Sequence, residues 1–100
     1  MKKTVVIIPT YNEIENISLI IDSLFNINLT LDVLVVDDNS PDGTSKVVKN
    51  LMDKYKKKLF LEKKDKKEGL GVAYVHGFNW ALVRNYDYIF QMDADLSHNP

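Results

Sequence analysis

Residues 4–9 read Thr-Val-Val-Ile-Ile-Pro, a short and continuous apolar run that is rich in β-branched side chains. A run of this kind is typical of a strand that is buried on both faces, as in a parallel sheet. From Glu13 onward, apolar residues recur three and four positions apart, which predicts an amphipathic helix with Asn12 as its N-cap. The apolar face of this helix carries Ile14, Ile17, Ile21, Leu24 and Phe25. The chain therefore opens with a buried strand and a helix that packs on the sheet.

The pattern of strand, polar turn and helix then repeats. Residues 33–36 form a second buried strand, residues 37–43 are a dense cluster of turn residues, and a second helix starts near Thr44. A short third strand, with the character of a sheet edge, covers residues 59–61. The inner face of the second helix is expected to carry Val47, Val48, Leu51, Met52 and Tyr55. Two such units in succession favour an α/β fold.

Residues 69–71, Gly-Leu-Gly, open a third helix, and residues 88–92 form a fourth strand. The third helix carries small residues at every fourth position, which allow it to approach the sheet closely. These are Ala73, Gly77 and Ala81, beside a larger apolar stripe of Tyr74, Phe78 and Leu82. We therefore predict a βαβαβαβ chain with a four-stranded parallel sheet, in the strand order 3-2-1-4, and helices on both faces, like half of a Rossmann fold.

The composition sets limits on what the chain can be. Its 100 residues fit one domain, and the shares of 45% hydrophobic and 27% charged residues exclude disordered and low-complexity classes. The absence of cysteine excludes disulfides, thiolate metal sites and cysteine nucleophiles. No run approaches about 18 consecutive apolar residues, so we expect no membrane-spanning helix or signal peptide.

The basic residues are unevenly placed. The formal net charge of -1 argues against a general attraction to nucleic acid, yet eight of the 13 basic residues fall between Lys54 and Lys67. The simpler interpretation of this cluster is a solvated helix end and loop. The alternative is attraction to phosphate or to an anionic membrane surface.

Each cluster of polar residues follows a predicted strand. Residues 11–13 follow the first strand, residues 37–42 the second, and residues 93–95 the fourth. In a sheet of order 3-2-1-4 these three strands are neighbours, and their carboxyl ends meet where open α/β sheets bind ligands. The sequence therefore predicts a binding site at this edge.

Four carboxylates would meet there, from Asp37, Asp38, Asp93 and Asp95. They would repel one another unless a cation or hydrogen-bond donors joined them, and a hard divalent cation such as Mg²⁺ or Mn²⁺ prefers carboxylate oxygens. Asp-X-Asp is also a common turn motif. For Asp37 and Asp38 we favour ligand contact over a solvated turn, because carboxylates accept hydrogen bonds from ribose hydroxyls or a base edge.

Several other polar residues have two readings. Tyr11 could pack in an ordinary way or stack on a nucleotide base, and we favour stacking only because the other polar clusters accompany it. Glu13 could simply interact with the positive start of a helix. The run Asp42-Gly-Thr favours a turn and cap over ligand contact. His76 is expected to be a structural or surface residue, and His98 is a candidate for contact with an acceptor. Trp80 is expected to be a packing residue, or to cover an interface with protein outside this chain.

Four segments resemble, in order and spacing, the N-terminal motifs of family 2 glycosyltransferases. They are Ile7-Ile-Pro-Thr-Tyr-Asn-Glu13, Val35-Val-Asp-Asp-Asn-Ser-Pro-Asp-Gly-Thr44, Gly69-Leu-Gly-Val-Ala-Tyr-Val-His-Gly77 and Met92-Asp-Ala-Asp-Leu-Ser-His-Asn-Pro100. The first segment and Asp-X-Asp are shared across the family. Ser40-Pro-Asp-Gly-Thr44, the Gly-Leu-Gly segment and Asp93-Ala-Asp-Leu-Ser-His98 are more similar to polyprenol-phosphate (dolichol-phosphate) mannosyltransferases. The resemblance covers essentially the whole chain and implies a GT-A fold, with residues 1–100 as the N-terminal part of a nucleotide-sugar-binding domain.

The resemblance also implies roles for individual residues. The guanosine of a donor would be held by Pro9, Tyr11, Glu13, Val36 and Asp38. Asp93 and Ala94 would line the nucleotide and sugar, and Asp95 would bind a Mg²⁺ or Mn²⁺ ion on the diphosphate, with Asp93 and Ser97 as further metal ligands. Asp93 and Asp95 are thereby the expected catalytic residues. Lys67 lies in a region that is basic in relatives and would reach a phosphate.

The implied reaction is the inverting, metal-dependent transfer of mannose from GDP-mannose to a polyprenyl (dolichyl) phosphate. Relatives continue past Asp-Ala-Asp with further strands, an acceptor-phosphate site and interfacial or membrane helices, so we expect this chain to need a C-terminal half or a membrane-anchoring partner. The resemblance implies a location at the cytoplasmic face of a membrane, and no nucleic-acid partner is expected.

Three alternatives are open at the level of sequence. The first is another family 2 enzyme that uses UDP-glucose or a related donor. The second is a non-catalytic nucleotide-binding fragment that pairs with a partner chain. A NAD-binding Rossmann domain is disfavoured, because the first strand is followed by Pro9-Thr-Tyr-Asn-Glu rather than by Gly-x-Gly-x-x-Gly.

Overall fold

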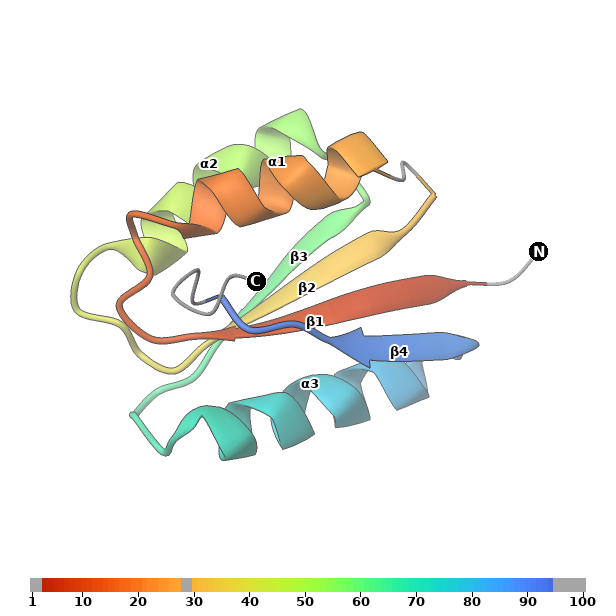
Figure 1. Cartoon of the computed structure of the whole chain (residues 1–100). Coiled ribbons are helices and arrows are strands. Elements are labelled where there is room, and N and C mark those ends of the chain that lie inside the picture. The colour runs from red at the N-terminus through yellow and green to blue at the C-terminus, as the bar shows by residue number, and fades with distance from the viewer. Residues whose placement is uncertain (1–2, 28–29, 95–100) are drawn as a thin grey trace.

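The computed structural model of the chain describes residues 3–27 and 30–94. Within these residues, strands and helices alternate along the chain in the predicted order (Figure 1). The elements are β1 (Thr4–Thr10), α1 (Ile17–Ile27), β2 (Asp32–Asp37), α2 (Thr44–Lys54), β3 (Leu59–Lys63), α3 (Leu70–Val83) and β4 (Tyr88–Gln91).

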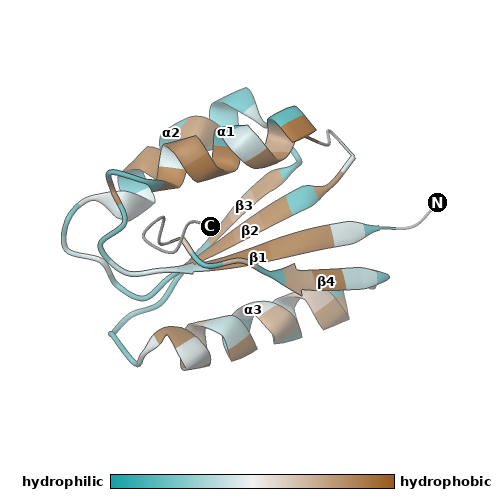
Figure 2. Ribbon diagram, in the orientation of Figure 1, coloured by the Kyte–Doolittle hydropathy of each residue, from teal (hydrophilic) through white to brown (hydrophobic). Residues whose placement is uncertain are grey.

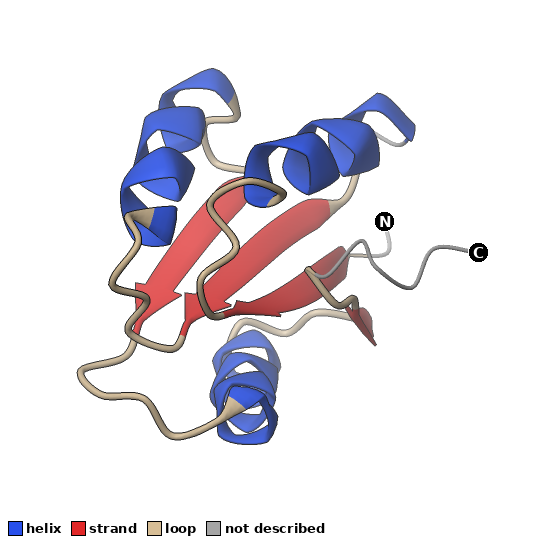
Figure 3. Cartoon of the chain, turned by 60° about the vertical axis from the view of Figure 1, so that its left-hand side comes forward, coloured by secondary structure: helices blue, strands red, loops and turns tan. Residues whose placement is uncertain are grey.

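The sheet has the predicted topology. Its strand order is β3-β2-β1-β4, and every neighbouring pair is parallel. Helices α1 and α2 cover one face, and α3 covers the other (Figures 1 and 3). The predicted fold class, strand order and placement of helices on both faces are therefore confirmed. The carboxyl ends of all four strands lie at the same end of the sheet, where the polar clusters were expected. We call this end the carboxyl edge.

Side chains alternate between two cores along the central strands. Val6 and Ile8 of β1 pack with α1 and α2, whereas Val5 and Ile7 pack with α3. Both sets are buried because helices lie on both faces, which explains the continuous apolar run of this strand. Figure 2 shows the same contrast, with apolar strands in the middle and polar loops at the carboxyl edge.

Helix α3 lies close to the sheet through its small residues. Ala73, Gly77 and Ala81 are buried against β1 and β2, as the spacing predicted. A Cβ atom added at Gly77 would lie 2.7 Å from Cγ2 of Ile7 and 3.0 Å from Cγ2 of Val36. The absence of a side chain at this position therefore sets the distance between helix and sheet.

The start of the first helix differs from the prediction. The turns at residues 14–16 lead into α1, which begins at Ile17 rather than directly after Asn12. Asn12 has a positive φ of 57° and donates its backbone N–H to Oγ of Ser40, at 2.8 Å. The N-cap prediction for Asn12 is therefore wrong, because the helix begins five positions later, at Ile17.

Strand β4 is an edge strand of the sheet and is unevenly covered. Ile89 is half-buried and packs with the core under α3. On the other face, Tyr88 is 48% exposed and Phe90 is 55% exposed. Tyr88 pairs in register with Thr4 of β1, and Phe90 pairs with Val6. This face of β4 is therefore an open apolar surface.

Candidate functional site

The carboxyl ends of β1 and β2 are joined by hydrogen bonds of side chains and backbone. The hydroxyl of Thr10 donates to Oδ1 of Asp37 at 2.7 Å, and the N–H of Asp38 donates to the carbonyl of Thr10 at 2.9 Å. The segment after β1 is further tied to the loop after β2 through Ser40, which accepts from the N–H of Asn12. The first and second polar clusters therefore form one unit, as predicted from the strand order.

Asp37 is a structural residue within this unit. Its side chain is fully buried and accepts hydrogen bonds from Thr10, from the Ser40 hydroxyl at 2.6 Å and from the Ser40 N–H at 2.8 Å. These donors replace water around the carboxylate and occupy both of its oxygens. The carboxylate of Asp37 therefore serves the fold, and its contact with a ligand stays a prediction.

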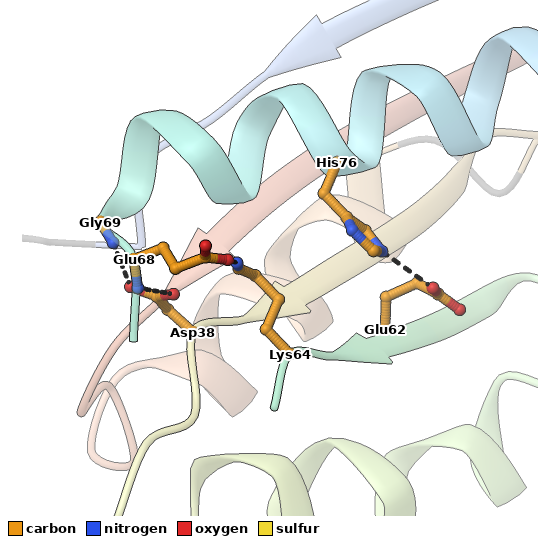
Figure 4. A network of polar contacts seen from close by, with 6 residues as sticks. All are labelled: Asp38, Glu62, Lys64, Glu68, Gly69 and His76. Atoms are coloured by element: carbon orange, nitrogen blue, oxygen red, sulfur yellow. Dashed lines mark hydrogen bonds and ion pairs between the residues drawn. The ribbon is translucent and has the colours of Figure 1, made fainter. Parts of the chain in front are cut away.

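Asp38 holds the start of α3. Its side chain is also buried, and its two oxygens accept the backbone N–H groups of Glu68 and Gly69 at 2.9 and 2.8 Å (Figure 4). Hydrogen bonds thus stabilise the carboxylates of Asp37 and Asp38 within the protein. The predicted cation among the four acids stays a prediction.

Asp42 and Thr44 organise the start of α2, as the turn-and-cap interpretation predicted. Oδ1 of Asp42 accepts from the N–H and the hydroxyl of Thr44, at 2.9 and 2.5 Å, and Oδ2 accepts from the N–H of Ile14 at 3.2 Å. Partial burial acts to raise the pKa of Asp42, but these hydrogen bonds outweigh it and lower the pKa. The Thr44 hydroxyl also accepts the N–H of Glu13 at 3.0 Å, which places Glu13 at the site.

Tyr11 lies at the same edge, with its ring half-buried. The ammonium of Lys67 lies 4.7 Å from the centre of this ring, which is the geometry of a cation–π contact. The structure therefore brings together Tyr11, Glu13, Asp38 and Lys67, which belong to segments far apart in sequence. Pro9 and Val36 are paired in register just below them and are buried, so their side chains belong to the sheet.

The third polar cluster is described only in part. Asp93 is exposed just after β4, where the N–H of Met92 donates to the carbonyl of Ile7, and Ala94 is buried in the core with α1. Asp95, Ser97 and His98 lie outside the described residues. Within residues 3–27 and 30–94, no three side chains of His, Cys, Asp or Glu are placed to hold a metal ion. The metal ligands thus stay a prediction.

The lysine cluster divides between the two ends of β3. At the amino end, Lys54 lies 3.3 Å from Asp22 and Lys58 lies 3.8 Å from Asp32. At the carboxyl end, Lys64 is 8% exposed and pairs with Glu68, and this partner lowers the pKa of the Glu68 carboxyl. Only the carboxyl-end lysines lie near the candidate site.

Helix α3 and strand β3 are linked by a polar contact between the side chains of His76 and Glu62. Nε2 of His76 lies 3.0 Å from Oε1 of Glu62, with both side chains partly exposed (Figure 4). Trp80 packs against Phe60 and Tyr86. The structural roles predicted for His76 and Trp80 are confirmed.

Sequence reasoning missed three residues that build the site. Thr10, Ser40 and Glu68 supply the donors that fix Asp37 and Asp38. Ser40 follows Asp37 by three positions, a spacing at which an Asp side chain commonly accepts a local N–H. That signal was present in the sequence. The donation by Glu68 uses its backbone, so no residue type could have indicated it.

The whole arrangement matches a known family. Residues 5–100 match the model described as glycosyl transferase family 2. The chain belongs to glycosyltransferase family 2. The resemblance carried by the four sequence motifs is thereby confirmed, and the NAD-binding alternative is excluded.

Individual relatives agree with this family. The chain is 43% identical over 99 residues to polyprenol monophosphomannose synthase of Mycolicibacterium smegmatis, covering 99% of this chain and 37% of the relative. It is 45% identical over 98 residues to undecaprenyl-phosphate mannosyltransferase of Micrococcus luteus, covering 98% of this chain and 40% of the relative. The chain therefore spans less than half the length of these family 2 proteins.

A solved structure supports the GT-A fold. The mannosyltransferase PcManGT of Pyrobaculum calidifontis, in complex with GDP-Man and Mn²⁺, is similar with a TM-score of 0.75 and 28% identity. The similarity covers 93% of this chain and 27% of that protein. The four-stranded unit is thus similar to part of this larger mannosyltransferase.

Proposed function

We propose that this chain is the donor-binding part of an enzyme that transfers mannose from GDP-mannose to a polyprenyl phosphate. One observation carries the proposal: nearly the whole chain aligns, at 43 and 45% identity, with two proteins named for this transfer. The solved mannosyltransferase with GDP-Man and Mn²⁺ supports the donor and the metal.

The carboxyl edge of the sheet offers groups suited to a nucleotide. Pro9, Tyr11, Glu13, Val36 and Asp38 are the proposed guanosine contacts. Tyr11 supplies an aromatic face, while the buried Pro9 and Val36 would act through the backbone that shapes the floor of the site. Asp38, whose oxygens hold Glu68 and Gly69, would position the loop in addition to contacting the ligand.

The proposed metal ligands are Asp93, Asp95 and Ser97, with Ala94 and Asp93 lining the nucleotide and sugar. Carboxylate and hydroxyl oxygens are hard donors that suit Mg²⁺ or Mn²⁺, and the chain has no cysteine to favour a softer metal. Asp93 is exposed at the end of β4, next to the end of β1. When bound, such an ion neutralises charge on the departing diphosphate.

The proposed transfer needs no proton acceptor in the protein. An oxygen of the acceptor phosphate attacks the anomeric carbon, the bond from that carbon to the diphosphate breaks, and GDP leaves with the bonding electrons. The configuration inverts because attack and departure take place on opposite faces. The acceptor phosphate is already anionic near neutral pH, so the residues of this chain only bind and orient the donor.

Acceptor binding is assigned to protein beyond the described residues. Because the chain spans 37 and 40% of the two relatives, we propose that a C-terminal half or a partner chain supplies the acceptor-phosphate site and a membrane anchor. No helix in residues 3–27 and 30–94 is both long and apolar enough to cross a membrane. We place the enzyme at the cytoplasmic face of a membrane as part of the same proposal.

Titration of the purified chain with GDP and with UDP, each with Mn²⁺, tests the donor. We expect weak binding of GDP and binding of UDP that is weaker by about tenfold, since base discrimination rests on a few pocket contacts. Asp93→Asn should remove the Mn²⁺ dependence, whereas the matched change Asp53→Asn, on the exposed side of α2, should not. Tighter binding of UDP would instead favour another family 2 donor.

Transfer by the chain alone is a second measurement. We expect negligible formation of polyprenyl phosphomannose by these residues without further polypeptide. Robust turnover would contradict the need for a C-terminal half. Binding of neither nucleotide, together with co-purification of a partner chain, would favour the non-catalytic alternative.

A further inference from the structure

Helix α3 presents apolar side chains to solvent along its whole length. Its inner side packs on the sheet, yet its surface carries six exposed large apolar residues. They are Leu70, Val72, Val75, Phe78, Leu82 and Val83, and we call them the α3 face. The helix contains no Asp, Glu, Lys or Arg in its 14 residues. At about 1.5 Å per residue it extends roughly 21 Å, so the α3 face is a long apolar surface.

Helix α2 differs from α3 in this respect. Every exposed position of α2 is polar or charged, namely Lys46, Lys49, Asn50, Asp53 and Lys54. Among the described residues, α1 and α2 share one face of the sheet, whereas α3 lies alone on the other face (Figures 1 and 3). An extended apolar surface on a helix without a neighbour favours a binding partner over water.

Basic residues flank the α3 face at both ends. Before the helix, residues 63–68 carry four lysines against two acids, and Glu68 is already paired with Lys64. After the helix, Arg84 is exposed, and Cζ of its guanidinium lies 4.0 Å from the centre of the Trp80 ring. An apolar helix face with cations at its ends and an amphipathic aromatic residue beside it suits an anionic lipid surface.

The ends of α3 relate this face to the candidate site. The start of the helix is held at the carboxyl edge by the hydrogen bond from the N–H of Gly69 to Asp38. Its end lies near the beginning of β1, where Nζ of Lys3 donates to the carbonyl of Arg84 at 3.0 Å. The helix thus runs the length of the sheet and begins beside the site. A bilayer that lay along α3 would therefore also lie next to a bound donor.

We propose that the α3 face is a lipid-contact surface, on which the chain lies against an anionic membrane with α3 parallel to the bilayer plane. The inference rests on the proposed function, because a polyprenyl acceptor is held in a membrane and the donor must be presented at its surface. The apolar side chains enter the boundary between headgroups and acyl chains, and Lys66 and Arg84 lie among the headgroups. Such a contact is reversible, so it orients the site and leaves anchoring to the rest of the enzyme.

Co-sedimentation of the full chain with vesicles tests this surface. We expect binding to vesicles of phosphatidylglycerol and phosphatidylcholine in equal parts, and binding weaker by about fivefold or more to phosphatidylcholine alone. Leu82→Gln should weaken binding to the mixed vesicles by about fivefold, because an apolar side chain leaves the lipid without a change of charge.

The matched control is Leu19→Gln. Leu19 is also a helical leucine and is 59% exposed, against 51% for Leu82, but it lies on α1 across the sheet. We expect its replacement to change vesicle binding by less than about twofold. Equal losses for the two variants would show unspecific adsorption and would overturn the proposal.

A tryptophan placed on either side of the sheet reports which face touches lipid. Trp80 is the only tryptophan of the chain, so Trp80→Phe gives a silent background. In that background, brominated acyl chains should quench the fluorescence of Val75→Trp and not that of Leu19→Trp. Equal quenching at both positions would contradict contact through α3. Circular dichroism verifies that these variants are folded, and the comparison of glutamine variants keeps Trp80 and does not depend on this background.

A second copy of the chain is the other candidate to cover α3. A chain that is dimeric, becomes monomeric in Leu82→Gln and does not bind vesicles would overturn the lipid contact. The vesicles contain neither nucleotide nor polyprenyl phosphate, so the result is separate from the proposed function. Binding of GDP without binding of vesicles would overturn this inference alone. Binding of vesicles through α3 without binding of GDP or UDP would support the lipid contact and overturn the proposed function.

Discussion

Neighbouring residues of the same type perform different tasks at the end of β2. Asp37 is fixed by the hydroxyls of Thr10 and Ser40, whereas Asp38 binds two backbone N–H groups of the loop before α3. Adjacent residues of a strand point to opposite faces, so the two carboxylates meet different segments. Asp37 joins β1 to β2, and Asp38 joins β2 to α3. The hydrogen bonds of Asp38 hold the basic loop, residues 64–69, close to Tyr11.

At the residue scale, Asp42→Ala should destabilise the fold by about 1 kcal/mol at pH 7, because the N–H groups of Ile14 and Thr44 lose the carboxylate that accepts them. The pKa of Asp42 is lowered in the folded chain, so its stabilisation is full above the ordinary aspartate pKa. It is lost as pH falls through the lowered value. Urea unfolding between pH 7 and pH 2 measures the difference from the unsubstituted chain.

The control for this prediction is Asp53→Ala. Asp53 lies exposed in the last turn of α2, so its removal changes the charge equally without removing these hydrogen bonds. We expect a change within about 0.5 kcal/mol, as for an ordinary surface substitution. A loss for Asp42→Ala that did not shrink in acid would contradict the proposed role of its carboxylate.

At the scale of elements, α3 connects the fold to the site. Its buried small residues set its distance from β1 and β2, and its first residues are held by Asp38. The position of α3 on the sheet therefore fixes where the loop before it, which contains Lys67, lies. The sequence indicated the close approach through the spacing of Ala73, Gly77 and Ala81, but the contact with Asp38 was not foreseen.

Gly77→Ala should destabilise the fold by about 1–3 kcal/mol, because the added methyl overlaps Ile7 and helix or sheet must shift. This loss runs against helix propensity, by which alanine is the better helix former. Gly71→Ala, in the same helix with no atom within 4 Å of the new methyl, should stabilise by up to about 1 kcal/mol. Thermal unfolding of both variants makes the comparison. Equal effects would show that packing does not decide the outcome.

At the scale of the whole molecule, the sheet is well covered along three strands and open along the fourth. The exposed face of β4 presents Tyr88 and Phe90, and a hollow beside it is lined by Leu19, Ile20, Ser23 and Met92. Large exposed apolar surfaces beside a strand edge favour association. This side of the molecule therefore exposes apolar side chains to water.

Phe90→Lys should reduce self-association of the chain while changing its free energy of unfolding by no more than about 0.5 kcal/mol. Ile89→Lys, one position earlier, should destabilise by at least about 2 kcal/mol, because Ile89 packs with the core under α3. Light scattering after size exclusion measures association, and urea unfolding measures stability. A Phe90→Lys chain that associates as strongly as the original would refute the role of this face.

The sequence by itself determined the order of elements, the strand order and the edge at which the site lies. These follow from local patterns: the β-branched run of residues 4–9, the spacing of small residues in α3, and polar clusters placed directly after strands. Such patterns record which residues face the core and which face solvent, and they can be read from residues that are close in sequence. The family motifs used the same local information.

Only the tertiary structure decided which partner each polar residue has. Asp37 bonds to Thr10, 27 positions away, and Asp38 bonds to Gly69, 31 positions away. Such choices depend on which loops the packed helices bring together, so no local spacing contains them. For the same reason, the contact between Lys67 and Tyr11, 56 positions apart, could not be read from the sequence. Burial then makes each hydrogen bond obligatory, because no water can replace the missing donor.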